Sequence, residues 1–234
     1  MQQEYTNVIG RLYELVVKLR NSSTNNSDEA FAEVFDIDSK DNVQIFLCYS
    51  NLFRLCDESI SLIDKYYPNK PSLKKHIENT MKALSKIEFN GYNGMNNFNS
   101  YLTSDTLTGL ETISLIAQCT EKTLSDDKLS ELSKDINSML DDILKSNMNE
   151  SLKCILSDRL IDILKILKNY EIYGSEKVVK SIESSIGAIY LNQPNIKNDS
   201  EKNLCKDILL KLTSFVTFLS DSVPLIEYIE KLLS

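Results

Sequence analysis

Residues 43–67 read VQIFLCYSNLFRLCDESISLIDKYY, and this stretch decides the fold. Its apolar side chains recur every three or four positions over a broad arc, which is typical of a long α-helix packed on several sides. The positions are Val43, Phe46, Leu47, Tyr49, Leu52, Phe53, Cys56, Ile60, Ile63 and Tyr67. Pro68 and Pro71 end the pattern, because proline cannot continue a helix. We therefore expect a central helix over this stretch.

The same helical period continues on both sides of this stretch. Further periodic runs begin at Tyr5, Leu73, Leu129, Leu152, Val178 and Leu204. Residues 90–100 hold two glycines and five asparagines, which weaken a helix, so they predict a loop. No alternating run of convincing length indicates a β-strand. We predict an all-α protein, a multi-helix bundle of about eight helices.

Length and hydrophobic content favour one helical domain. With 234 residues, of which 42% are hydrophobic, the chain can bury a sizeable core. We expect residues 1–234 to form a single helical domain, from which a C-terminal helical pair at 199–234 could separate. Pro224 would open the second helix of that pair.

The balance of charge argues against nucleic acid as a partner. The chain carries 34 acidic and 26 basic residues, a net charge of −8. Binding to a phosphate backbone depends on clustered Lys and Arg, and the acidic excess works against it. We expect no nucleic-acid partner.

The N-terminus and the cysteines indicate the compartment. Residues 1–7 lack the basic region and the apolar run of a signal peptide, so we expect a cytoplasmic protein. The five cysteines are odd in number and lie mostly within apolar helical pattern. In a reducing compartment we expect them to be packing residues with free thiols.

Residue types used in chemistry are scarce in this chain. His76 is the only histidine, and no carboxylate lies at helical spacing from it, so we interpret it as a surface residue. The segment Asp36–Asp41 fails as a calcium loop, because Lys40 and Asp41 stand where a ligand and a glycine are needed. No nucleotide-binding, hydrolase or metal motif is recognisable. We predict no catalytic residue, no metal ligand and no cofactor.

An acidic segment near the N-terminus is the first candidate for an interaction. Residues 28–41 hold six acids and one lysine, and Phe31 and Phe35 lie on one helical side. The polar loop before this segment gives it little to pack on, so we expect it to be mobile or weakly docked. Phe31 and Phe35 would bind a partner, and the acidic charge favours a basic groove.

The most apolar part of the chain, near its C-terminus, is the second candidate. Phe215 and Phe218 point about 60° apart around a helix axis, and Leu210 widens the arc. One packed face does not easily cover such an arc, so a second protomer, a protein partner or lipid should share it. Charged residues and Pro224 within 208–226 argue against a membrane-spanning helix.

The segment 129–191 carries a resemblance. Its features are Leu152-Lys153, Leu156, Leu160 and Ile163, the run Tyr170-Glu-Ile-Tyr-Gly174, and Ile186-Gly187. In this segment the chain resembles uncharacterised all-α bacterial proteins of mobile-element or phage-defence type. The resemblance implies a helical fold and a bacterial defence context, and it implies no activity.

These observations favour a non-catalytic protein. We expect a helical protein–protein interaction or regulatory component, with a protein partner or a homo-oligomer, in bacterial defence or immunity. The alternative is a membrane-acting effector that perturbs bilayers with its apolar C-terminal helices. A third reading is an enzyme whose carboxylate site the sequence does not locate.

Overall fold

The structure is a computed structural model that describes residues 5–89, 92–117, 120–196 and 198–220. Within these ranges it contains ten α-helices, two 3-10 helices and two strands of two residues each. The all-α bundle is therefore confirmed, with ten helices in the described ranges where about eight were expected. The second helix of the expected C-terminal pair falls in 221–234, outside the described residues.

The chain divides into two compact units. The first unit is Thr6–Thr120, and the second comprises Met1–Tyr5 and Glu121–Ser234. Each unit has its own set of packed helices. The expectations of a single domain over 1–234 and of a separable pair at 199–234 stay predictions.

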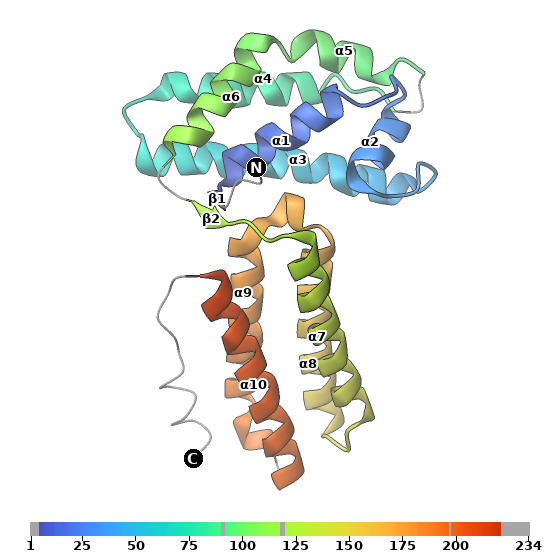
Figure 1. The fold of residues 1–234 in the computed structure, drawn as a ribbon, viewed down its shortest axis with the longest axis vertical. Coiled ribbons are helices and arrows are strands. Elements are labelled where there is room, and N and C mark those ends of the chain that lie inside the picture. The colour runs from blue at the N-terminus through green and yellow to red at the C-terminus, as the bar shows by residue number, and fades with distance from the viewer. Residues whose placement is uncertain (1–4, 90–91, 118–119, 197, 221–234) are drawn as a thin grey trace. The chain divides into compact units, whose positions relative to one another are not determined.

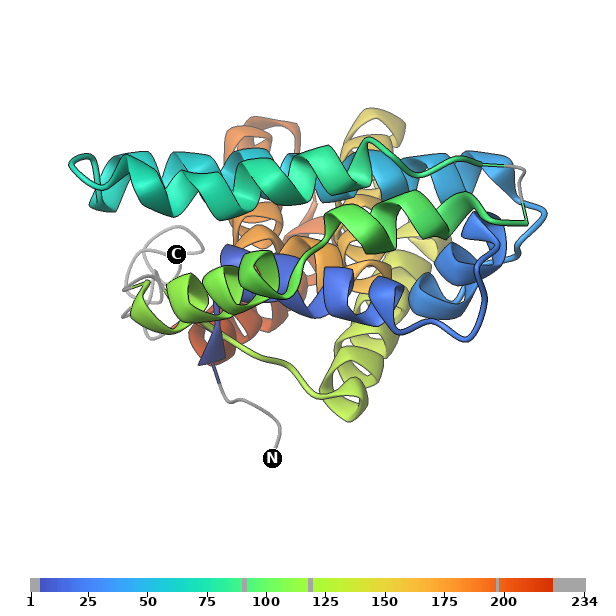
Figure 2. The ribbon, with the colours of Figure 1, turned by 90° about the horizontal axis from the view of Figure 1, so that it is seen from above.

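The described part of the first unit holds six α-helices (Figure 1). They are α1 (Val8–Arg20), α2 (Ser27–Phe35), α3 (Asn42–Tyr66), α4 (Lys74–Leu84), α5 (Gly94–Tyr101) and α6 (Ser104–Ile116), with a 3-10 turn, η1 (Pro71–Leu73), before α4. Helix α3 packs on α1, α2 and α4, which agrees with the central position expected from its sequence. Figure 2 shows the shorter helix α4 lying beside part of α3.

Polar side chains fix where α1 begins and what it packs against. The Asn7 side-chain oxygen accepts hydrogen bonds from the N–H groups of Ile9 (3.1 Å) and Gly10 (3.0 Å). Its Nδ2 group donates to the carbonyl oxygen of Ser114 on α6 at 2.8 Å. One buried asparagine thus caps α1 and joins it to α6, because a buried amide is retained only when its hydrogen bonds are made.

The loop predicted for residues 90–100 is wrong from Gly94 onward, where the structure has helix α5. It forms over Gly94–Tyr101 because Met95 and Phe98 are fully buried, and that burial outweighs the weak helix propensity of the neighbouring asparagines. Gly94 is required for close packing, since a Cβ atom there would lie 2.0 Å from the Glu88 carbonyl oxygen.

His76 is a packing residue, so its interpretation as a surface side chain is wrong. The imidazole lies against Gly109 of α6, where a Cβ atom would come within 2.2 Å of the ring nitrogen Nδ1. The side chain is half-buried, and the Nδ1 atom itself is buried. The glycine lets α4 and α6 approach closely enough for the ring to fill the space between them.

The second unit is built around four long helices (Figure 1). They are α7 (Asp126–Lys145), α8 (Glu150–Lys168), α9 (Tyr170–Leu191) and α10 (Asp199–Leu219), with a 3-10 turn, η2 (Gln193–Asn195), before α10. Helix α8 packs on α7 and α9, and α10 packs on α9 and α7, around a common apolar core. The strand β2 (Glu121–Lys122) precedes α7 and pairs with β1 (Tyr5–Thr6).

Gly174 kinks α9 near its start. Its φ of 69° lies in the left-handed region that favours glycine. Beside the kink, the Tyr170 hydroxyl is 2.6 Å from Ser175 Oγ and donates to the Lys122 carbonyl oxygen at 3.0 Å. The Tyr170 hydroxyl oxygen also accepts the Leu124 N–H at 3.0 Å. These bonds hold the kinked start of α9 to the segment that leads into α7.

Candidate interaction surfaces

The structure places Phe31 and Phe35 in a cluster of aromatic rings in the first unit. Phe31 is fully buried, and its ring centroid lies 5.6 Å from those of Phe35 and Phe89 and 6.2 Å from that of Tyr49. Phe35 is half-buried. A partner that used Phe31 would have to displace α2 from these rings, so the interaction role of Phe31 and Phe35 stays a prediction.

The three predicted residues on α10 have different surroundings. Leu210 is exposed, Phe215 is half-buried against the core, and Phe218 is 39% exposed. The Nζ atoms of Lys122 and Lys128 lie 4.5 and 5.6 Å from the Phe218 ring centroid. Of these residues, Phe215 therefore packs on the core, Phe218 makes cation–π contacts and Leu210 faces solvent. Their role as an interface stays a prediction.

An apolar surface on α3 is the feature that sequence reasoning missed. Val43, Phe46 and Leu47 are 70%, 63% and 54% exposed. We call these three residues the α3 apolar surface. The opposite side of the same turns is buried, at Ile45, Cys48 and Leu52. The sequence did contain a signal, because a helical turn of 3.6 residues places these two sets on opposite sides of one helix.

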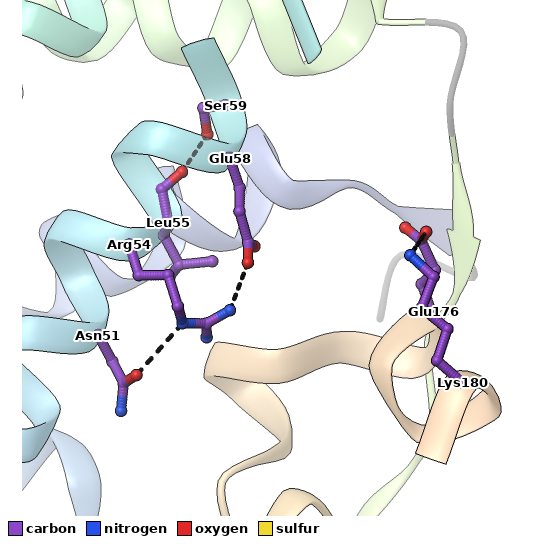
Figure 3. A network of polar contacts seen from close by, with 7 residues as sticks. All are labelled: Asn51, Arg54, Leu55, Glu58, Ser59, Glu176 and Lys180. Carbon is purple, nitrogen blue, oxygen red and sulfur yellow. Dashed lines mark hydrogen bonds and ion pairs between the residues drawn. The ribbon is translucent and has the colours of Figure 1, made fainter. Parts of the chain in front are cut away.

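The α3 apolar surface passes into a polar face along the same helix. Arg54 Nε donates to Asn51 Oδ1 at 3.3 Å, and Arg54 Nη1 forms an ion pair of 2.5 Å with Glu58 Oε1 (Figure 3). On the buried side of the same turns, the Ser59 hydroxyl donates to the Leu55 carbonyl oxygen at 2.7 Å (Figure 3). The apolar surface is therefore limited to the first turns of α3.

Acidic residues flank the α3 apolar surface at both ends. Asp38 and Asp41 precede α3, and Asp57 shares the later polar face with Glu58. Against these four acids stand two basic residues, Lys40 and Arg54. Since Arg54 is already paired with Glu58, the local charge available to a partner is negative.

A groove lies between α9 and α10 in the second unit. It has a volume of about 770 Å³. Its apolar lining comes from Ile186, Ile189, Tyr190, Pro194, Ile196, Cys205 and Leu209, and its polar lining from Gln193, Asp199, Lys202, Asn203 and Lys206. We call this feature the α9–α10 groove.

The thiols in the core are poorly suited to act as nucleophiles. Burial raises the pKa of the Cys56 thiol to about 12, with a smaller contribution from the Asp57 carboxylate. Burial and, to a lesser degree, Glu201 raise the pKa of the Cys205 thiol to about 11. Because the thiolate is the reactive form, both groups are unreactive near neutral pH. Cys56, Cys154 and Cys205 are free thiols, Cys48 is buried, and Cys119 lies outside the described residues.

Metal sites and membrane-spanning helices can be assessed in the part of the chain that the structure describes. There, no group of three or more His, Cys, Asp and Glu side chains could hold a metal ion. In the same ranges, no helix combines the length and the hydropathy needed to cross a bilayer.

Comparisons with known proteins were made by family, by sequence and by structure. No family model matches the chain, and neither a curated protein nor a solved structure matches it. The function proposed for the chain is therefore inferred from its own residues.

Proposed function

We propose that the protein is a non-catalytic interaction module that binds a protein partner through the α3 apolar surface. The supporting observation is that three adjacent large side chains on one helix side are each more than half exposed. A contiguous exposed apolar surface of this kind is typical of docking sites in folded proteins. Full burial of a large apolar side chain contributes roughly 1.5–3 kcal/mol, so covering all three would support a specific complex.

The surroundings of the surface favour a partner with positive charge. Asp38, Asp41 and Asp57 are placed to meet basic residues that flank an apolar stripe. A helix is the natural partner, because Val43, Phe46 and Leu47 follow the i, i+3, i+4 spacing of helix pairing. We therefore propose an amphipathic helix with lysine or arginine beside its apolar face as the bound element.

A synthetic peptide tests this chemistry. The probe is a fluorescein-labelled amphipathic helix with leucine on one face and lysine on the other, titrated with the whole protein and followed by fluorescence anisotropy. We expect saturable binding that weakens as NaCl is raised from about 0.05 to 0.5 M, since salt screens exposed charges. A peptide with glutamate in place of lysine should bind much more weakly.

Two outcomes would contradict the proposal. Equal binding of the lysine and glutamate peptides would show that the acidic residues beside the surface do not select the partner. Concentration-dependent dimers in light scattering, abolished by Phe46→Asp, would show that a second copy of this chain occupies the surface.

The wider role rests on the resemblance over 129–191. It supports a regulatory or immunity component of bacterial defence, acting in the cytoplasm. The membrane-acting effector remains the alternative, and leakage of dye from anionic liposomes would favour it over the interaction module.

A further inference from the structure

We infer that the α9–α10 groove binds a single-chain amphiphile with an anionic head group, of the class of a long-chain fatty acid. The site lies in the second unit and is independent of the proposed function of α3. Its volume of about 770 Å³ falls within the range of roughly 300–1,000 Å³ that is usual for small-molecule sites.

The apolar lining suits a hydrocarbon chain. Ile189, Cys205 and Leu209 belong to the buried core of the four-helix unit and form apolar lining of the groove. Tyr190 and Ile196 keep exposed or half-buried apolar surface beside it. A flexible chain laid along this lining would remove that surface from water.

Two lysines in the groove carry the positive charge that would attract an anionic head group. Lys202 and Lys206 stand one turn apart on the exposed side of α10, and both line the groove. Neither lysine takes part in the ion pairs found among the residues that the structure describes. Both ammonium groups can therefore meet a carboxylate ligand.

The acids of α10 are mostly directed away from these lysines. The Glu201 carboxylate accepts the Asn149 N–H at 3.3 Å, and Asp207 lines a different groove, between α7 and α10. Asp199 is the one acid in the lining, so the charged groups of the groove sum to +1 (two lysines and one aspartate). In a chain with a net charge of −8, this local excess of positive charge selects an anionic ligand over a cationic one.

The connection between the helices favours a small ligand over a protein helix. The η2 residues Gln193 and Pro194, with Ile196, line the groove where α9 turns into α10. A helix of about 10 Å diameter requires an open channel, whereas a single hydrocarbon chain fits against a turn. We therefore assign the groove to a free amphiphile.

The test measures binding of dodecanoate by isothermal titration calorimetry, with dodecanol and butanoate as ligand controls. Dodecanoate should bind with one site per chain, and both controls should bind at least tenfold more weakly. Lys202→Glu/Lys206→Glu should raise the Kd for dodecanoate roughly tenfold, because two exposed ion pairs are lost. Lys134→Glu/Lys211→Glu is the matched control, since it makes the same charge change outside the groove and should leave the Kd unchanged.

Other results would overturn the inference. Equal affinity for dodecanol, or equal Kd values in the two double variants, would show that the lysines do not recognise the head group. Equal binding of butanoate would indicate an anion site without a chain site. Retention on phosphatidylglycerol vesicles without binding of free dodecanoate would assign the lysines to a membrane surface. If the Glu variant unfolds, Lys202→Gln/Lys206→Gln provides the same comparison, with an expected rise in Kd of about threefold.

Discussion

At the scale of single residues, the contact between His76 and Gly109 determines how closely α4 and α6 approach. Gly109→Ala would place a methyl group within 2.2 Å of the imidazole, so the ring or a helix must move. We expect the free energy of unfolding in urea to fall by about 1–3 kcal/mol.

The control for this prediction is Gly187→Ala. Gly187 lies inside α9, and a Cβ atom added there would meet no atom within 4 Å apart from the backbone of its own helix and its chain neighbours. Alanine is the better helix former there and should stabilise by up to about 1 kcal/mol. His76→Ala combined with Gly109→Ala should recover part of the loss. Equal unfolding midpoints for Gly109→Ala and wild type would contradict the close contact.

The cysteines differ in reactivity because of burial. Cys154 is exposed, whereas the Cys56 and Cys205 thiols are buried, with pKa values raised to about 12 and about 11. A raised pKa keeps the thiol protonated at pH 7.5, and reactivity should increase only as the pH approaches the raised value. Site-resolved mass spectrometry after brief iodoacetamide treatment should find Cys154 modified first. Modification of Cys205 at the same rate would mean that α10 is not packed as described.

At the scale of elements, Tyr170 joins the kinked start of α9 to the segment before α7. Tyr170→Phe removes the hydroxyl that accepts the Leu124 N–H and bonds Ser175 Oγ. A buried donor without a partner costs about 1–3 kcal/mol, so thermal unfolding followed by circular dichroism should shift to lower temperature. Tyr190→Phe, at a half-exposed tyrosine of the same helix, should not shift it. Equal shifts of the unfolding temperature in the two variants would show that the hydrogen bonds of the Tyr170 hydroxyl do not stabilise the fold.

The sequence was informative where local chemistry decides the structure. Ser125 is a residue type favoured before the first turn of a helix, and its hydroxyl oxygen accepts the Lys128 N–H at 3.4 Å. Gly174 follows the same kind of local rule, because a glycine that ends a helical run favours the positive φ observed there. Asn147, three residues before Glu150, fits the sequence pattern of a capping box, but Asn149 caps α8, since two asparagines two residues apart offer the same cap chemistry.

The sequence was less informative where tertiary packing decides. Helix α5 depends on the burial of Met95 and Phe98, which a local asparagine-rich pattern does not reveal. Phe31 and Phe46 are both aromatic residues near the start of a helix, yet one is fully buried and the other is 63% exposed. The helical period shows that the first turns of α3 have apolar residues on two sides, and only the positions of neighbouring helices determine which side is buried.

At the scale of the whole molecule, the acidic charge and the exposed apolar residues act together. In the complex that we propose, the net charge of −8 would repel further copies of the chain and attract basic partners, and the α3 apolar surface would supply the short-range attraction. Charge sets the rate and the choice of partner, and apolar burial sets how long the complex lasts.

If the α3 apolar surface is a docking site, a charge placed on it should weaken binding of the partner. Phe46→Asp places a charge at its centre, at a position exposed enough to leave the free energy of unfolding within about 0.5 kcal/mol of wild type. Leu115→Asp is the matched control, because Leu115 is 68% exposed on α6 of the same unit.

The most direct measurement is the Kd of the leucine–lysine peptide for these two variants and wild type. We predict that Phe46→Asp raises the Kd at least tenfold, a loss of about 1.4 kcal/mol, while Leu115→Asp leaves it within about twofold. Equal Kd values for all three proteins, with all three folded, would contradict the claim that the α3 apolar surface binds the partner.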